Sequence, residues 1–221
     1  MKILDVPQSG KAGTLVSYQT RYGQIRRRYV VPRYPCTSIQ VLRRRAMGRA
    51  RFLWRTLTDE QRVAWNVAAH NRHTRPHLNQ SGPLTGYLLF VKINCNLAAI
   101  SLPMVLDSPA EPRFEASPVV KLIATNTNGQ IALKLSVSRK PANPIIVLGT
   151  RPRSQGVSYV DHFTILGVLP DPVRGASDIT DLFLGKYPTL RAGMRVFIRT
   201  VQQVNGWQDL PTQVSAIVPA A

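Results

Sequence analysis

The sequence predicts an α+β protein of two domains, in which a basic β-hairpin arm and a group of helices precede an antiparallel β-sandwich. Apolar residues recur at intervals of three and four between residues 37 and 102, and at every second position beyond residue 118. Four prolines between residues 103 and 118 separate the two patterns. We therefore expect a basic extended arm over 1–36, a helical domain over 37–102, a proline-rich linker over 103–118 and the sandwich over 119–221.

The arm is expected to form a β-hairpin. Strand-forming residues lie on both sides of the tetrapeptide Arg21–Gln24, which contains a glycine. The second side carries three consecutive arginines, Arg26 to Arg28, next to Tyr29. Pro32 and Pro35 end regular pairing, because proline has no amide hydrogen to donate to a sheet.

A long helix capped by Thr37 or Ser38 is predicted next. Its apolar residues share one stripe: Ile39, Leu42, Ala46, Ala50, Leu53 and Leu57. Its polar face is almost purely cationic: Arg44, Arg51 and Arg55 lie opposite the stripe, and Arg43, Arg45 and Arg49 flank it. Like charges four residues apart, such as Arg45 and Arg49, repel each other by about 0.2–0.5 kcal/mol. We therefore expect an anionic partner to compensate this helix.

Two further helices are predicted before the linker. Thr58 and Gln61 have the spacing of a capping box, which marks the start of the second helix. The segment Ser81–Pro83 is expected to open the third helix, because proline is tolerated in a first helical turn. Pro103 is expected to end it.

Alternating apolar residues predict six or seven short strands in the second half, at a spacing typical of antiparallel sandwiches. The predicted strands are 120–124, 131–137, 145–149, 163–169, 195–201 and 213–218. Asn126–Gly129 supplies a tight turn between the first two strands. One interruption, Ser177–Leu182, is predicted to be a helical turn capped by Ser177.

The positive charge is concentrated in the first half. Residues 1–100 hold 17 Lys and Arg against 3 Asp and Glu, whereas residues 101–221 hold 12 against 8. Arginine dominates the first group, and its planar guanidinium matches both phosphate and carboxylate. The candidate binding residues are Arg26, Arg27, Arg28, Arg33, Arg43, Arg44, Arg45, Arg51 and Arg55, with Tyr22 and Tyr29. Nucleic-acid phosphates and acidic neighbouring subunits both remain open as partners.

No pattern of catalytic residues is present, so we expect no enzyme and no cofactor. The sequence has no Gly-x-Ser-x-Gly elbow and no P-loop, and its first hundred residues contain only Asp5, Asp59 and Glu60 as acids. His70, His73 and His77 have a spacing that metal ligands can adopt, but no acid or cysteine accompanies them before Cys95, and we expect a polar helix end or loop instead of a metal site.

Each half of the chain resembles a known family. The segments Gly193–Trp207 and Leu210–Val218 resemble the last strands of a fibronectin type III-like sandwich, which implies a display or adhesion module. The segments Gly10–Gly13, Leu57–Asn66 and Gly86–Asn94 resemble small structural proteins of phages and prophages. This second resemblance implies a role in a virion.

We therefore expect a non-enzymatic phage virion protein of the capsid-associated, head–tail or decoration type, assembled in the host cytoplasm. Its partners would be other virion subunits, in a homo- or hetero-oligomeric assembly, and DNA through phosphate contacts. No membrane contact is expected, because the longest apolar run near the middle of the chain, Leu88–Val91, is far shorter than the roughly 18 residues that span a bilayer. The alternative is a soluble, sequence-nonspecific DNA- or RNA-binding protein, or an accessory protein of a ribonucleoprotein.

Overall fold

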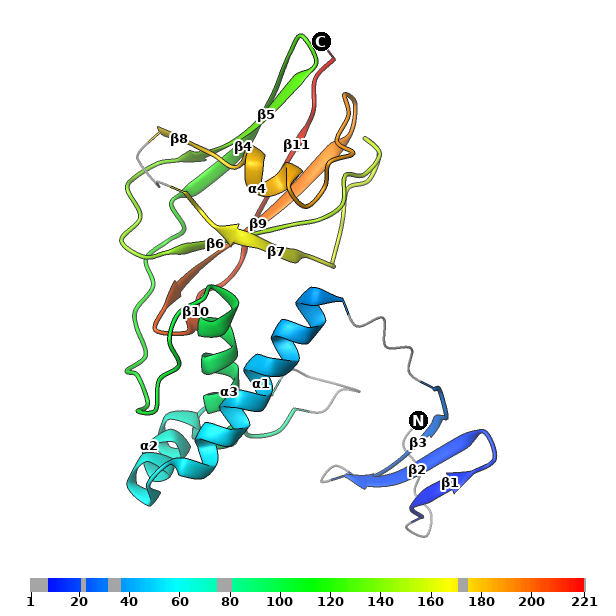
Figure 1. The fold of residues 1–221 in the computed structure, drawn as a ribbon, viewed down its shortest axis with the longest axis vertical. Helices are drawn as coiled ribbons and strands as arrows, with labels where there is room; N and C mark the ends of the chain where they lie inside the picture. Colours follow the sequence, from blue (N-terminus) through cyan, green and yellow to red (C-terminus); the bar gives the residue numbers. More distant parts are fainter. Residues whose placement is uncertain (1–7, 21–22, 32–36, 75–80, 171–174, 221) are drawn as a thin grey trace.

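The computed structural model describes residues 8–20, 23–31, 37–74, 81–170 and 175–220 (Figure 1). It combines helices with antiparallel β-sheets, as the α+β prediction requires. The helices lie between a small N-terminal sheet and two larger C-terminal sheets in the order of the sequence. The chain therefore changes from helix to strand in the region where the sequence predicts the change.

The N-terminal arm is a three-stranded antiparallel sheet. Its strands are β1 (Gly10–Ala12), β2 (Leu15–Thr20) and β3 (Gly23–Arg28), paired in the order β1-β2-β3. The predicted hairpin is confirmed as β2 and β3, and β1 is an additional strand. Figure 1 draws this sheet apart from the helices and from the larger sheets.

Three helices follow the arm, and two of their starts are those predicted. They are α1 (Ser38–Thr56), α2 (Asp59–Ala69) and α3 (Gly86–Ala99). The Thr37 side chain caps α1 by accepting a hydrogen bond from the amide of Gln40 at 3.4 Å. Thr58 and Gln61 form the predicted capping box, with distances of 3.2 and 3.1 Å for its two hydrogen bonds.

The predicted start of the third helix is wrong. Thr85, not the segment Ser81–Pro83, caps α3, and its hydroxyl accepts a hydrogen bond from the amide of Leu88 at 3.3 Å. Pro83 instead forms a β-bridge with His73. The helix ends at Ala99, four residues before Pro103, because Ser101 has a positive φ of 60°. The helix is thus shorter at both ends than the sequence predicted.

The helices share a core built around aromatic rings. Trp65, Phe90 and Ala50 are completely buried, and the rings of Trp65 and Phe90 meet edge to face with centroids 5.1 Å apart. Only the C-terminal half of α1 contributes to this core. Leu42, predicted on the buried stripe, is 62% exposed, because no described element covers the N-terminal half of α1.

Two antiparallel sheets form the second half of the chain. One has the order β4-β5-β8, and the other has the order β10-β9-β6-β7 with β11 paired to β9. The strands are β4 (Val119–Thr127), β5 (Gln130–Val137), β6 (Ile145–Gly149), β7 (Thr164–Val168), β8 (Gly175–Asp178), β9 (Arg195–Val204), β10 (Trp207–Gln208) and β11 (Thr212–Ile217). All six predicted strands are present, and β8 and β10 are additional.

The two sheets bury one common apolar core. Leu133 and Leu135 of β5 belong to the same cluster as Val147 of β6 and Val196 and Ile198 of β9, and all five are fully buried. The register explains this, because alternate residues of each strand face the same side. A short helix, α4 (Thr180–Leu184), adds Phe183 to the cluster.

The predicted cap of that short helix is wrong. Ser177 lies inside β8, where it pairs with Leu135, and its side chain is buried. The carboxylate of Asp178 instead accepts a hydrogen bond from the amide of Thr180 at 2.8 Å. The sequence pattern was misread because β8 is a short strand that lies at the edge of its sheet.

The proline-rich segment lies along the helices and is not a free tether. The buried side chain of Asn94 accepts a hydrogen bond from the amide of Val105 at 2.8 Å and donates to its carbonyl at 3.1 Å. Trp65 donates to the carbonyl of Leu106 at 2.7 Å. Met104 and Phe114 pack against the helical core. The domain boundaries themselves stay a prediction.

The tip of the β9–β10 hairpin enters the helical core. Trp207 belongs to the same cluster as Trp65 and Phe90, and its indole donates to the carbonyl of Pro109 at 3.1 Å. Asn96 of α3 donates to the carbonyl of Gly206 at 2.9 Å. A β-carbon added to Gly206 would lie 2.5 Å from a side-chain carbon of Ile93. The helices and the sheets are therefore joined by direct packing.

This joint predicts unequal effects of two glycine substitutions. Gly129 and Gly206 both follow an asparagine in a tight turn and both have a positive φ, 83° and 85°. Nothing lies within 4 Å of a β-carbon at Gly129. We expect Gly129→Ala to lower the free energy of unfolding by about 1–2 kcal/mol through backbone strain. Gly206→Ala should lose about 1–3 kcal/mol more, because its methyl group overpacks Ile93.

Denaturant unfolding of both variants measures the difference. Equal losses for the two substitutions would contradict close packing of the hairpin tip against α3.

Candidate anion-binding surface

The basic region contains no acidic residue in its own sequence. Residues 6–58 contain eleven Arg and one Lys and no Asp or Glu. All ion pairs formed between described residues involve residues beyond this stretch, beginning with the pair of Arg62 and Asp59 at 2.9 Å. The candidate arginines therefore lie where the chain itself offers no neighbouring carboxylate in sequence.

The candidate residues form two surfaces. Arg26, Arg27 and Arg28 lie on β3, and Tyr29 follows this strand directly. Arg43, Arg44, Arg45, Arg51 and Arg55 lie on α1 and are all exposed. Figure 1 draws the arm apart from α1, so the two sets do not merge into one cluster. Tyr22 and Arg33 lie outside the described residues.

The two faces of the arm differ in chemistry. Because side chains alternate along a strand, Arg26 and Arg28 share one face, and Arg27 shares the other with Val16, Tyr18 and Ile25. The guanidinium of Arg26 is held by the hydroxyl of Ser17 at 3.2 Å and by the side chain of Gln8. The first face therefore combines cationic and polar groups with the exposed Leu15, which pairs with Arg28.

The second face of the arm combines cations with tyrosine rings. The guanidinium carbon of Arg27 lies 5.6 Å from the ring centre of Tyr18, and the ammonium of Lys11 lies 4.0 Å from that of Tyr29. Both tyrosines are exposed. Tyr18 and Lys11 were not among the predicted candidates, although the register of the hairpin would have placed Tyr18 beside Arg27.

The arginines of α1 differ in how firmly they are held. The guanidinium of Arg51 donates to the hydroxyl of Tyr87 at 3.1 Å, and this tyrosine packs edge to face on Trp54. This contact fixes Arg51 against α3. Arg43, Arg45 and Arg49 extend from α1 ahead of the helical core and are exposed. They are therefore placed to meet a neighbouring molecule.

Large apolar side chains lie between these arginines. Leu42 is 62% exposed, Phe52 is 65% exposed and Met47 is half exposed. Surfaces that bind nucleic-acid phosphates do not need such groups, whereas protein interfaces are enriched in aromatic residues, methionine and arginine. Sequence reasoning missed Met47 and Phe52, although neither fits the predicted apolar stripe and that misfit was a signal.

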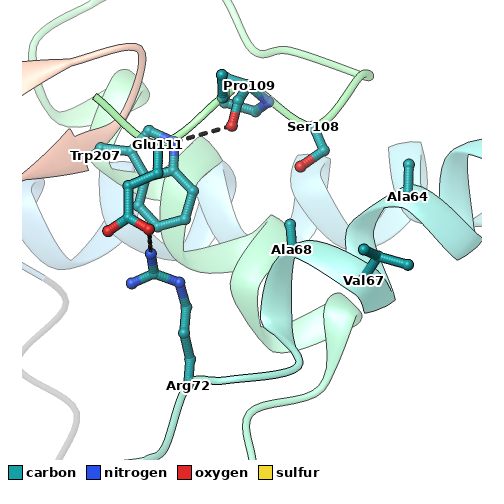
Figure 2. A pocket seen from close by; sticks show the side chains of 9 residues that line it. Ala64, Val67, Ala68, Arg72, Ser108, Pro109, Glu111 and Trp207 are labelled. Atoms are coloured by element: carbon teal, nitrogen blue, oxygen red, sulfur yellow. Dashed lines mark hydrogen bonds and ion pairs between the residues drawn. The ribbon is translucent and has the colours of Figure 1, made fainter. Parts of the chain in front are cut away.

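A shallow hollow of about 410 Å³ lies beside the joint between helices and sheets (Figure 2). Arg72 crosses it: its guanidinium pairs with the carboxylate of Glu111 and stacks on the indole of Trp207, 4.3 Å from the ring centre. Ala64, Val67 and Ala68 of α2 form its apolar wall. The lining of the hollow thus combines one ion pair with apolar and aromatic side chains.

His70, His73 and Cys95 lie on separate elements of the part of the chain that the structure describes. His70 lies at the C-terminal end of α2 and His73 in the bridge to Pro83, whereas His77 and Cys36 lie outside the described residues. Within the described ranges, no three His, Cys, Asp or Glu residues are grouped as metal ligands would be. Burial raises the pKa of the Cys95 thiol, which disfavours the nucleophilic thiolate.

No protein-family model, curated protein or solved structure matches this chain. Among the described helices, none has the length and apolar character needed to cross a bilayer. The two resemblances named above stay predictions.

Arg45 and Arg49, two of the exposed arginines of α1, should contribute nothing favourable to folding. Arg45 and Arg49 are one helical turn apart and repel each other. We expect Arg45→Glu to raise the free energy of unfolding by about 0.4–1 kcal/mol, because repulsion becomes attraction. Arg45→Gln, which only removes the repulsion, should give about half of that gain. Thermal unfolding of the full chain measures both, and a clear loss of stability in Arg45→Glu would mean that Arg45 supports the fold.

Proposed function

We propose that this protein is a non-enzymatic structural component of an assembled particle, held in place by its basic arm and by α1. The observation that carries the proposal is the stretch 6–58, in which twelve cationic side chains have no acidic residue among them. These side chains repel one another, and an anionic neighbour would offset that repulsion. The resemblance to phage structural proteins makes a virion the proposed particle.

The second half of the chain suits such a role. Its two sheets share one core, which supports the proposal of a fibronectin type III-like sandwich that projects or packs against partners. The tip of the β9–β10 hairpin is anchored in the helical core. A force or contact on either half would therefore be passed to the other through packed side chains.

The neighbour of α1 is proposed to be a protein subunit. Leu42, Met47 and Phe52 are exposed between the arginines and gain free energy only when an apolar surface covers them. A carboxylate-bearing subunit with an apolar patch would satisfy both kinds of group. Nucleic acid would neutralise the arginines but would not cover the apolar side chains.

The arm supports the second candidate function, nonspecific binding of DNA or RNA. Exposed Tyr18 and Tyr29 lie beside Arg27 and Lys11, a combination that can stack on bases and neutralise phosphates. Counterion release would make such binding strongly dependent on salt. A virion protein that faces packaged DNA can use both surfaces.

Paired variants of α1 test the proposal. The full-length chain is produced with Leu42→Ser and Phe52→Ser together, or with Arg43→Glu, Arg45→Glu and Arg49→Glu together. We expect both variants to fold but to leave the particle fraction when lysates of producing cells are sedimented, whereas the wild type stays with the particle. The serine variant should keep the wild-type affinity for a DNA duplex, since it retains every arginine.

A different pattern would favour the nucleic-acid binder. In that case the wild type would sediment with no particle. Its affinity for a duplex would fall by about 10³–10⁵ between about 50 and 200 mM salt, as expected for six to ten phosphate contacts. Electron microscopy that locates residues 21–55 relative to nucleic-acid density would separate the two candidates directly.

A further inference from the structure

One face of α2 is apolar and exposed. Val63 is 59% exposed and Val67 is 70% exposed, and they are one turn apart on the side of the helix opposite the buried Trp65 and Ala69. Val67 also lines the hollow beside Arg72, whose far wall is formed by residues 108–111 and Trp207 (Figure 2). Apolar side chains in such a strip gain free energy when a second surface covers them.

Acidic residues lie at both ends of this strip. Asp59 and Glu60 lie in the first turn of α2, and the Asp59 side chain is 94% exposed although it pairs with Arg62. Asp107 accepts a hydrogen bond from Gln61 at 2.8 Å beside them. Glu111 lies at the other end, at the rim of the hollow, where its carboxylate pairs with Arg72. In a chain with a formal charge of +18, this face is unusually acidic.

The arm has the complementary character. It carries Arg26, Arg27, Arg28 and Lys11 and no described acid, and it continues into Val30 and Val31, which are both exposed. Gln24 is its only buried residue among those described. Three or more strands are stable by themselves when they have a hydrophobic face or pack against a helix. Among the described residues, neither core cluster includes a residue of the arm, so a surface that supplies apolar groups and negative charge would stabilise it.

We infer that the arm of one copy of this chain docks on the α2 face of a second copy. The exposed tyrosines and valines of the arm would cover Val63 and Val67, and its cations would lie near Asp59, Glu60 and Asp107. The sizes agree, because a six-residue strand is about 20 Å long and an eleven-residue helix about 16 Å. The face of α1 is a poor alternative, since it would set arginines against arginines.

Such a contact joins two different surfaces and is therefore heterologous. A heterologous interface leaves one free arm and one free α2 face on every dimer, so that copies add head to tail into a ring or a filament. Figure 1 places α2 and the arm on opposite sides of α1 and α3, which favours contact between copies over contact within one copy. This inference rests on the proposed function, in which the basic region anchors the protein in an assembly.

Two complementary variants of the full chain test the pairing. The arm variant carries Arg27→Glu and Arg28→Glu, and the α2 variant carries Glu60→Gln and Val67→Gln, so that the altered arm and the altered face do not attract each other. All four side chains are exposed, so folding should be retained. A control variant with Val120→Ser and Lys121→Glu changes an equally exposed site on β4. Far-UV circular dichroism checks the fold, and light scattering measures the mass.

We expect the wild type and the control to form oligomers, and each of the two interface variants to be monomeric when alone. Mixing the two should give one-to-one dimers that grow no further, because the α2 face of the arm variant and the arm of the α2 variant are both intact. If the mixture contains only monomers, the proposed pairing of arm and α2 face is wrong. It is also wrong if the wild type remains monomeric up to about 0.1 mM, where weak specific interfaces already associate.

The same variants separate this inference from the proposed function in particle sedimentation. If the arm variant leaves the particle and the α2 variant stays, the basic arm binds another anionic partner, so the inference fails and the proposed function stands. If both variants stay in the particle and the α1 variants do so as well, the inference and the proposed function both fail.

Discussion

The insertion of the β9–β10 hairpin tip into the helical core is the contact on which the rest of the arrangement depends. Trp207 is buried with Trp65 and Phe90, and Gly206 approaches Ile93 so closely that no side chain fits between them. Through this contact the helices and the two larger sheets are joined by packing and not merely by the chain. The arm takes no part in either core, so it is the part left to bind something else.

The charge distribution indicates which kind of partner the arm would bind. Clustered arginines repel one another when no acidic residues lie among them. In this chain they cluster in the arm and along the exposed half of α1. Most of its few N-terminal acids lie at the start of α2. Opposite charges are thus separated onto different surfaces of one molecule, a pattern that suits contacts with neighbours better than contacts within the chain.

Local patterns predicted local structure well. The capping box at Thr58, the cap at Thr37 and the Asn-Gly turn at residue 129 were all readable, because each depends on hydrogen bonds or dihedral angles within four residues. The start of α3 was misplaced because Pro83 was taken as a residue of its first turn, whereas Thr85 caps the helix and the amide of Gly86 donates to Asn66 of α2. Leu42 was wrongly predicted to be buried. Periodicity shows which face of a helix is apolar, but it does not show how far along the helix other elements pack on that face.

The sequence by itself determined the α+β composition, the six principal strands, the basic first half and the identity of most candidate arginines, since these follow from residue type and spacing. Only the tertiary structure decided that Trp207 joins the helical core, that Arg72 lies between Glu111 and Trp207, and that the apolar face of α2 stays uncovered. These facts join residues more than 35 positions apart. No local preference specifies such a pair, because the free energy that selects it comes from burying surfaces that meet only after the chain has folded.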